Sequence, residues 1–258
     1  MKKQIILIFA AFGLLVQCQD SKNEVKSKIE QIFAENIYDF GRILQLNIFS
    51  DSTYTFTVIE KRPDYEKTEK FKGFCFLKND TIYFKPFEFE FNDSEKAVIK
   101  NGFVEFVNGK NPFKIEIKKN EFNTKSNLDF ENYKDYAVFT FDQRFYSSTY
   151  YNYKPNTIIA YEIKQSELIE IDEILKKCFS ANSSRLKNIN DYVKQCIPVI
   201  NSNQEKEVWI SCYCKDENIK KEYKYSIIQM DDGGKCNINL KINLTKHNYS
   251  QLNIAGEA

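Results

Sequence analysis

Residues 236 to 244 read Cys-Asn-Ile-Asn-Leu-Lys-Ile-Asn-Leu, the cleanest alternation of apolar and polar side chains in the chain. Successive side chains of a strand point to opposite faces, so the apolar residues share one face while the asparagines and Lys241 share the other. Turn-forming residues stand on both sides, at 231 to 234 (Asp-Asp-Gly-Gly) and at 245 to 248. The stretch therefore predicts a strand of an antiparallel sheet with one face against a core.

Further strands are expected around it, at residues 157 to 164, 192 to 200, 207 to 214, 223 to 230 and 249 to 255. After the first of them, Ser166 can cap a helix with a single apolar stripe. The stripe consists of Leu168, Ile171, Leu175, Cys178 and Phe179. A lone helix beside an antiparallel meander is expected to lie across its apolar face. This predicts an α+β roll over 157–258, whose layout resembles cystatin-like and NTF2-like folds in architecture only.

The N-terminal half has a period of two from Ile43 to Ile117, which indicates strands with one buried face. Phe87, Phe89 and Phe91 alternate with glutamates in the same way. Asn101-Gly102 is the dipeptide that a two-residue type I′ hairpin favours. It joins strands expected at 97 to 100 and 103 to 107. We expect a strongly curved antiparallel sheet or an incomplete barrel over 37–122.

The first residues indicate export. Two lysines precede an apolar run from Ile5 to Val16, the n-region and h-region of a secretory signal. The run is too short for a transmembrane helix, which needs about 20 apolar residues. A hydrophilic stretch follows, and residues 27 to 35 have the apolar spacing of a short helix at best.

Residues 15 to 18, Leu-Val-Gln-Cys, resemble a bacterial lipobox, with Gln17 where Gly, Ala or Ser is usual. The resemblance implies that Cys18 receives a diacylglyceryl group, that the signal is cut just before it and that the new amine is acylated. Two or more chains anchor a protein stably in a bilayer, whereas one does not. We therefore expect Cys18 to be the lipidation site.

Several short sequence motifs in the C-terminal part look like those of uncharacterised exported lipoproteins of Bacteroidota. They are Asp191-Tyr192-Val-Lys-Gln-Cys196, Glu207-Val-Trp209-Ile-Ser-Cys212-Tyr-Cys214, Asp232-Gly-Gly234, Lys241-Ile-Asn-Leu-Thr245 and Ala255-Gly256-Glu-Ala258. The resemblance implies a protein of the cell envelope, the outer membrane being the expected location. It carries over no catalytic residues.

The remaining cysteines favour an oxidising compartment without fixing a pairing. If Val193, Ile197 and Val199 face the same core as the strand at 207 to 214, Cys196 points away from that core. Buried thiols or a disulfide are then expected among Cys178, Cys212, Cys214 and Cys236. If a bridge exists, we favour one from Cys178 to a sheet cysteine, because i and i+2 on one strand lie near the upper Cα distance for a disulfide.

The stretch from Phe145 to Tyr153 has no clean period. Tyrosine rings can stack on sugar faces while their hydroxyls form hydrogen bonds. Its candidate ligand-binding aromatics are Tyr146, Tyr150, Tyr151 and Tyr153. Packing at a sheet edge or domain junction explains the same residues.

Composition removes several function classes. A net charge of +1 provides no electrostatic excess for nucleic acid. Eight glycines and a single histidine, His247, leave phosphate loops, zinc-protease motifs and Ser-His-Asp arrangements unsupported. His247 falls in a predicted turn, where a solvated polar side chain is expected. We assign no catalytic residue, no metal site and no cofactor.

The sequence thus predicts a signal peptide at 1–17, a tether at 18–36, an antiparallel β domain at 37–122, a linker or extra strand at 123–156 and the α+β roll at 157–258. The expected function is that of a lipid-anchored bacterial cell-envelope protein with a non-catalytic binding or structural role, its partners being the membrane and no nucleic acid. One alternative is a small-molecule or glycan-binding lipoprotein. Another is a hydrolase or isomerase in an NTF2-like pocket, so enzyme activity stays open with a leaning against it.

Overall fold

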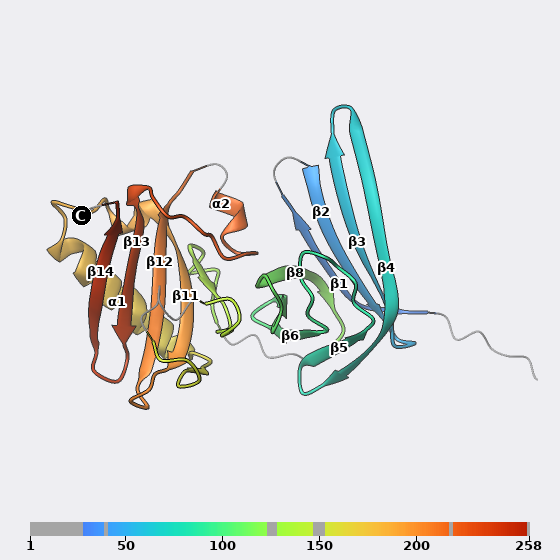
Figure 1. Ribbon diagram of the computed structural model, residues 1–258, viewed down its shortest axis with the longest axis horizontal. Coiled ribbons are helices and arrows are strands. Elements are labelled where there is room, and N and C mark those ends of the chain that lie inside the picture. Colours follow the sequence, from blue (N-terminus) through green and yellow to red (C-terminus); the bar gives the residue numbers. More distant parts are fainter. Residues whose placement is uncertain (1–27, 39–40, 123–127, 147–152, 217–218, 257–258) are drawn as a thin grey trace, which may run out of the picture.

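The chain forms a closed β-barrel and a second, separate sheet. The computed structural model describes residues 28–38, 41–122, 128–146, 153–216 and 219–256, and Figure 1 shows the two units side by side. Strands hold 49% of the residues and helices 11%. The predicted α+β class with a cystatin-like or NTF2-like C-terminal half is therefore wrong. Strand pairing between residues far apart in the chain, which sequence periodicity does not report, determines both units.

Eight antiparallel strands close the barrel. They are β1 (Glu30–Ile37), β2 (Arg42–Phe49), β3 (Thr53–Arg62), β4 (Tyr65–Lys78), β5 (Thr81–Lys85), β6 (Lys96–Lys100), β7 (Phe103–Phe106) and β8 (Phe113–Asn120). Closure comes from β1, which pairs with β2 on one edge and with β8 on the other. Because β1 covers most of residues 27 to 35, the short helix predicted there is wrong, and the predicted incomplete barrel is complete.

Aromatic side chains fill the barrel. An eight-stranded barrel has an interior just wide enough for side chains or one small ligand. Here Phe56, Phe84 and Phe106 are 0 to 1% exposed, and Phe106 stacks on Phe113 with ring centroids 4.4 Å apart. Phe87 and Phe89 also point inward, but they lie in a segment outside any strand. The strand predicted through Phe87 to Phe91 is wrong, although its alternation does report which rings are buried.

The second unit is a mixed sheet. Its strands are β9 (Tyr136–Val138), β10 (Ile159–Ala160), β11 (Tyr192–Ile200), β12 (Lys206–Cys214), β13 (Gly234–Asn243) and β14 (Asn248–Ala255). The helix α1 (Gln165–Ala181) and the short elements η2 (Ile189–Asp191) and α2 (Ile219–Glu222) complete it. β9 pairs with β11 in parallel, and the strand predicted at 223 to 230 does not form. The predicted antiparallel meander is confirmed for β11 to β14, which pair in sequence order, and the stretch expected to be a linker or an extra strand adds β9 beside β11.

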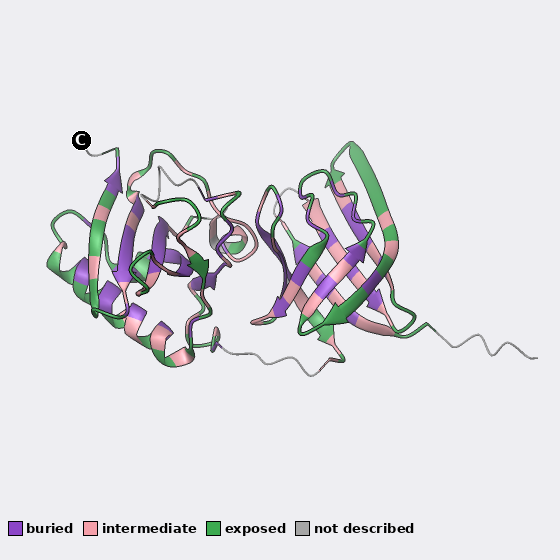
Figure 2. Ribbon diagram, turned by 60° about the horizontal axis from the view of Figure 1, so that its bottom comes forward, coloured by how far each residue is buried: buried purple, intermediate pink, exposed green. Residues whose placement is uncertain are grey.

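Both faces of the central strands β11 and β12 are covered, as Figure 2 shows in purple. On one face Cys196 and Ile210 lie opposite each other and join the cluster of α1, whose apolar stripe is buried as predicted. On the other face Val193 and Ile197 pack against segments around Phe139 and Phe141. The predicted register, which turned Cys196 away from the helix, is wrong because it assumed that one face of β11 was wet.

Two predictions that rest on residues adjacent in the sequence are confirmed. The Asn101-Gly102 hairpin forms, with Lys100 opposite Phe103 and φ values of 52° and 78° at the two turn residues. The apolar face of β13, with Ile238, Leu240 and Ile242, is buried as predicted. Both features depend on neighbouring residues, and local chemistry is sufficient to specify them.

One disulfide joins the adjacent strands β12 and β13, between Cys214 and Cys236. Cys178 and Cys212 are free and buried, so the favoured bridge from Cys178 to the sheet is wrong. The reason is position: Cys178 on α1 lies within the apolar cluster, while Cys214 and Cys236 are less buried at one end of the sheet. The ammonium of Lys187 lies 3.3 Å from the sulfur of Cys214 and 3.2 Å from that of Cys236.

We expect reduction of this bridge to cost about 3 kcal/mol of unfolding free energy, from the chain entropy of a loop with a sequence separation of 22. Urea denaturation with and without reductant measures the loss, and the double substitution Cys214→Ser, Cys236→Ser should remove the effect of reductant. Thiol titration in denaturant should rise by two equivalents on reduction. An unchanged thiol count would show that the bridge does not form.

Candidate functional site

Charged side chains are buried where the barrel meets the second sheet. Phe113 and Ile115 point into the barrel, so Lys114 between them points outward, as does Glu105 opposite it on β7. Outward residues of a barrel normally meet water, yet Lys114 is 3% and Glu105 2% exposed. The second unit covers them, so buried charge is concentrated at this junction.

Lys114 is held from both units. Its Nζ donates a hydrogen bond to the carbonyl oxygen of Val138 at 2.7 Å, and it lies 4.0 Å from the ring centroid of Phe139 and 4.7 Å from that of Phe103. Its backbone N–H donates to the carbonyl of Tyr225 at 2.8 Å. The ammonium is thus surrounded by one carbonyl and two aromatic faces, which attract a cation but do not neutralise it.

Glu105 accepts from both units as well. Its carboxylate forms an ion pair with the ammonium of Lys100 at 3.1 Å and accepts the backbone N–H of Thr140 at 2.6 Å. Lys100 also donates to the Thr140 hydroxyl. The cluster of Lys100, Glu105, Lys114 and Thr140 therefore ties β6, β7 and β8 to the chain that follows β9.

Burial and charge oppose each other in this cluster. Burial lowers the pKa of Lys114 from 10.5 to about 8, although the Glu105 carboxylate acts to raise it. Burial acts to raise the pKa of Glu105, but the ammonium groups of Lys100 and Lys114 and the Thr140 N–H hold it below its ordinary value. Glu105 is therefore ionised near neutral pH, and Lys114 has a small neutral fraction.

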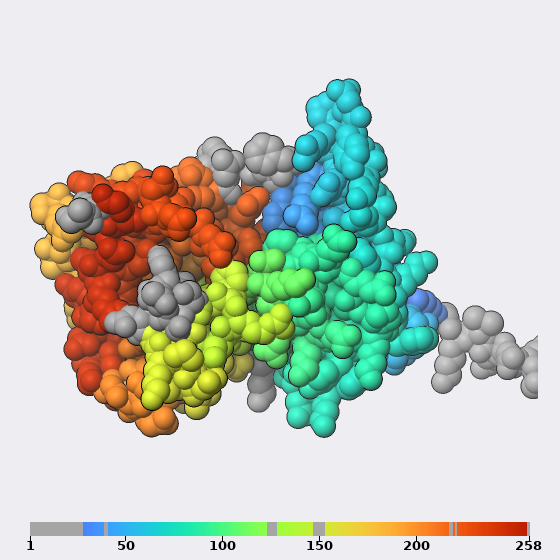
Figure 3. Space-filling model, in the orientation of Figure 1, coloured from blue at the N-terminus to red at the C-terminus, as the bar shows by residue number. Residues whose placement is uncertain are grey.

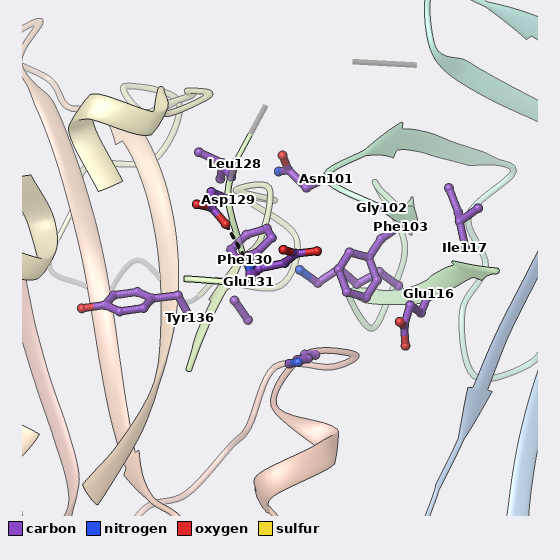
Figure 4. Close-up of a pocket in the computed structure, with 13 residues that line it drawn as sticks. Asn101, Gly102, Phe103, Glu116, Ile117, Leu128, Asp129, Phe130, Glu131 and Tyr136 are labelled. Atoms are coloured by element: carbon purple, nitrogen blue, oxygen red, sulfur yellow. Dashed lines mark hydrogen bonds between the residues drawn. The ribbon is translucent and has the colours of Figure 1, made fainter. Parts of the chain in front are cut away.

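A cavity of about 530 Å³ opens beside the cluster. Figure 4 shows that its walls come from both units, with Phe103 and Glu116 of the barrel on one side and Phe130 and Glu131 on the other. Lys114 and Lys224 also line it. The side-chain oxygen Oδ1 of Asn101, another lining residue, is buried and accepts no hydrogen bond from the described residues. The cavity thus combines aromatic rings, carboxylates and ammonium groups.

Further contacts fix the two walls. Phe113 forms an isolated antiparallel bridge with Ser226. The rings of Tyr38 and Tyr225 meet edge to face with centroids 5.7 Å apart. Elsewhere between the units, the guanidinium of Arg144 pairs with Asp93 at 3.0 Å. Backbone and side-chain contacts together thus join the barrel to the second unit.

Neither of the predicted ligand-binding tyrosines that the structure describes, Tyr146 and Tyr153, lies at this cavity. Tyr146 is 1% exposed and Tyr153 stacks on Trp209 with centroids 5.3 Å apart, so both pack against the sheet. Tyr150 and Tyr151 lie outside the described residues, and so does Cys18. Neither described tyrosine lines the cavity between the units.

Other candidate groups also lie away from it. His247 is an exposed turn residue whose Nδ1 lies 2.6 Å from a carboxylate oxygen of Glu170. No group of His, Cys, Asp and Glu that could hold a metal ion occurs in the described ranges. No helix among the described residues is both long and apolar enough to cross a membrane.

Sequence reasoning missed Lys114, Glu105 and the lining residues of the cavity. The alternation Phe113-Lys-Ile-Glu-Ile117 reads as an ordinary strand with a wet face. No sequence signal indicates that another unit covers this face. Lys114 is a buried hydrogen-bond donor whose pKa is lowered by burial to about 8, and its Nζ is engaged by the Val138 carbonyl.

Comparison with known proteins adds no relative: no family model, no curated protein and no solved structure matches the chain.

The depressed pKa of Lys114 predicts a pH dependence of stability. Below about pH 8 the lysine is protonated in both states, and the folded state bears the full cost of burying the charge. As pH rises through the folded pKa of about 8, the folded protein releases a proton that the unfolded chain keeps until about 10.5, so stability increases. Relative to Lys114→Met, the wild-type unfolding free energy should rise by about 1 kcal/mol between about pH 7 and about pH 9.

Urea denaturation at several pH values measures this difference, and Lys177→Met, at an exposed position on α1, is the control. A wild-type and Lys114→Met difference that stays constant over the range would show that Lys114 keeps an ordinary pKa.

Proposed function

We propose that the chain is a lipid-anchored protein of the bacterial cell envelope that binds a small polyhydroxylated ligand, of the glycan type, in the cleft between barrel and sheet, without catalysing a reaction on it. The lipobox-like Leu-Val-Gln-Cys at 15 to 18 supports the anchor. The Cys214–Cys236 disulfide supports an oxidising compartment, where such bridges persist. The cleft is the observation that carries the binding role.

The size and chemistry of the cleft fit such a ligand. Its volume of about 530 Å³ lies within the range of small-molecule sites, roughly 300 to 1,000 Å³. Phe103 and Phe130 offer aromatic faces to the apolar side of a sugar ring. Glu131 accepts hydrogen bonds from hydroxyl groups, whereas Lys224 donates to their oxygens. A ligand rich in hydroxyls meets both kinds of partner, whereas a purely anionic or cationic ligand meets repulsion from one of them.

A binding role also fits the state of the charged groups. Glu105 is engaged by Lys100 and Thr140, and Lys114 by Val138. A general acid or base needs a proton that it can exchange with substrate at close range. These groups instead hold the two walls of the cleft together.

The anchor is tested by metabolic labelling with a radioactive or clickable fatty acid. We expect the wild-type chain to take up label and to fractionate with membranes, and Cys18→Ala to do neither. Equal labelling of the two chains, or no labelling of wild type, would remove the anchor from the proposal.

The ligand class is tested with chitotriose, cellotriose and maltotriose as probes, using saturation-transfer NMR and calorimetry. Phe130→Ala should weaken binding of whichever probe binds by about tenfold, the worth of one aromatic contact, and Glu131→Gln should weaken it less. Glu173→Gln, at an exposed position on α1 outside the cleft, is the matched control and should change nothing. Binding that survives Phe130→Ala and Glu131→Gln unchanged, or no binding of any probe, would refute the assignment.

A further inference from the structure

The outward face of β4 carries aromatic rings between lysines. Side chains alternate along the strand, and Cys75 points into the barrel, so its neighbours Phe74 and Phe76 point out. Phe74 is 67% and Phe76 49% exposed. Lys72 and Lys78 share their face by the same alternation and are also exposed.

The two neighbouring strands extend this pattern. Tyr83 of β5 lies directly opposite Phe76, and the two rings stack at 4.8 Å with an angle of 8°. Lys85 lies opposite Phe74, and Lys96 of β6 lies opposite Tyr83 with its ammonium 5.6 Å from the ring centroid. Directly opposed residues share a face of the sheet. We name this surface the aromatic–lysine face; it consists of Lys70, Lys72, Phe74, Phe76, Lys78, Tyr83, Lys85 and Lys96.

The charge of this face is unbalanced. None of these eight positions holds an acid, and the acid on the same outward alternation of β4, Glu66, lies near the start of the strand and pairs with Lys61 of β3. No ion pair in the described part of the chain involves the lysines of this face, although another exposed lysine of β4, Lys67, pairs with Glu69. A contiguous exposed aromatic patch flanked by one sign of charge is typical of an interaction surface. Its partner must therefore be anionic and must accept aromatic rings.

Anionic lipid headgroups have both properties. Aromatic rings favour the interface between headgroups and acyl chains, and lysine side chains reach from there to phosphate. Lysines near an anionic leaflet each strengthen binding, by about fivefold. The pattern of rings inside and lysines around them matches this arrangement.

The position of the face agrees with a nearby membrane. The carbonyl of Ser52 accepts the N–H of Cys75 at 2.8 Å, and the carbonyl of Ile29 accepts that of Ser50 at 2.8 Å, so the first described residues lie at the same end of the barrel as Phe74. Residues 18 to 28 span at most about 35 Å when extended. In Figures 1 and 3, β4 forms the edge of the molecule farthest from the second sheet.

We propose that the aromatic–lysine face lies on the anionic headgroups of the membrane that anchors the chain, with the ligand cleft directed away from the bilayer. This rests on the proposed function only in that the chain resides at a membrane. A lipid anchor alone leaves a domain free to rotate, whereas a second contact on the barrel fixes which side meets the lipid.

The test uses the acylated chain in vesicles of phosphatidylcholine alone or of phosphatidylcholine and phosphatidylglycerol in equal parts, with amine acetylation read by mass spectrometry. Lys72, Lys78 and Lys85 should be protected only by the anionic vesicles, and Lys177 on α1 by neither. In a Cys18→Ala background, Phe74→Ser with Phe76→Ser should reduce partition into anionic vesicles at least tenfold. Ile159→Ser, which alters an exposed apolar residue of β10 that is 59% exposed, is the matched control and should not.

Equal acetylation of Lys72, Lys78 and Lys85 with and without anionic vesicles would overturn the proposal. So would protection that appears without lipid and grows with protein concentration, because a second copy of the chain would then occupy the face; sedimentation would confirm it. Acylation of Cys18 without lysine protection refutes the docking and leaves the anchor intact. Protection of these lysines in a chain whose Cys18 carries no acyl group refutes the anchor and leaves the docking intact.

Discussion

The burial of Lys114 and Glu105 between the barrel and the second sheet is the constraint on which the rest of the structure depends. Moving a charge out of water costs several kcal/mol, and only well-placed partners offset this. Here the partners come from both units: Lys100 from the barrel, and the Val138 carbonyl and Thr140 N–H from the second unit. Neither unit alone satisfies these charges. The two units therefore adopt one relative position, and the cleft beside Lys114 exists because of it.

The sequence predicted what adjacent residues determine. Three features are each encoded by residues that lie close together in the sequence. They are the Asn101-Gly102 turn, the buried face of β13 and the apolar stripe of α1. It did not predict what distant pairing determines. Barrel closure joins Glu30–Ile37 to Phe113–Asn120, and the parallel pairing of β9 with β11 decides between the two expectations for its stretch, a linker or an extra strand. Loop closure over such distances leaves no periodic signal.

The error at β11 has a particular cause. A strand with one wet face must hide its apolar residues together, and on that rule Val193, Ile197 and Val199 are expected on the helix side. Both faces of β11 are buried, so parity carries no information about which face meets α1. The same assumption misplaced Cys196. The lining residues of the cleft were missed for the converse reason, since Lys114 and Glu105 alternate as if their face were wet.

The two outward faces of the barrel invite comparison. On β7 and β8, Phe103 and Lys114 lie side by side, and the second sheet covers them with Phe139 and Tyr225. On β4 and β5, rings and lysines alternate in a similar way, but nothing in the described chain covers them. One barrel thus has two surfaces of the same chemistry, one of which is demonstrably a contact surface. Aromatic rings gain from leaving water on either face, so the same physical driving force that closes the contact on β7 and β8 acts on the rings of β4 and β5, which are uncovered among the described residues.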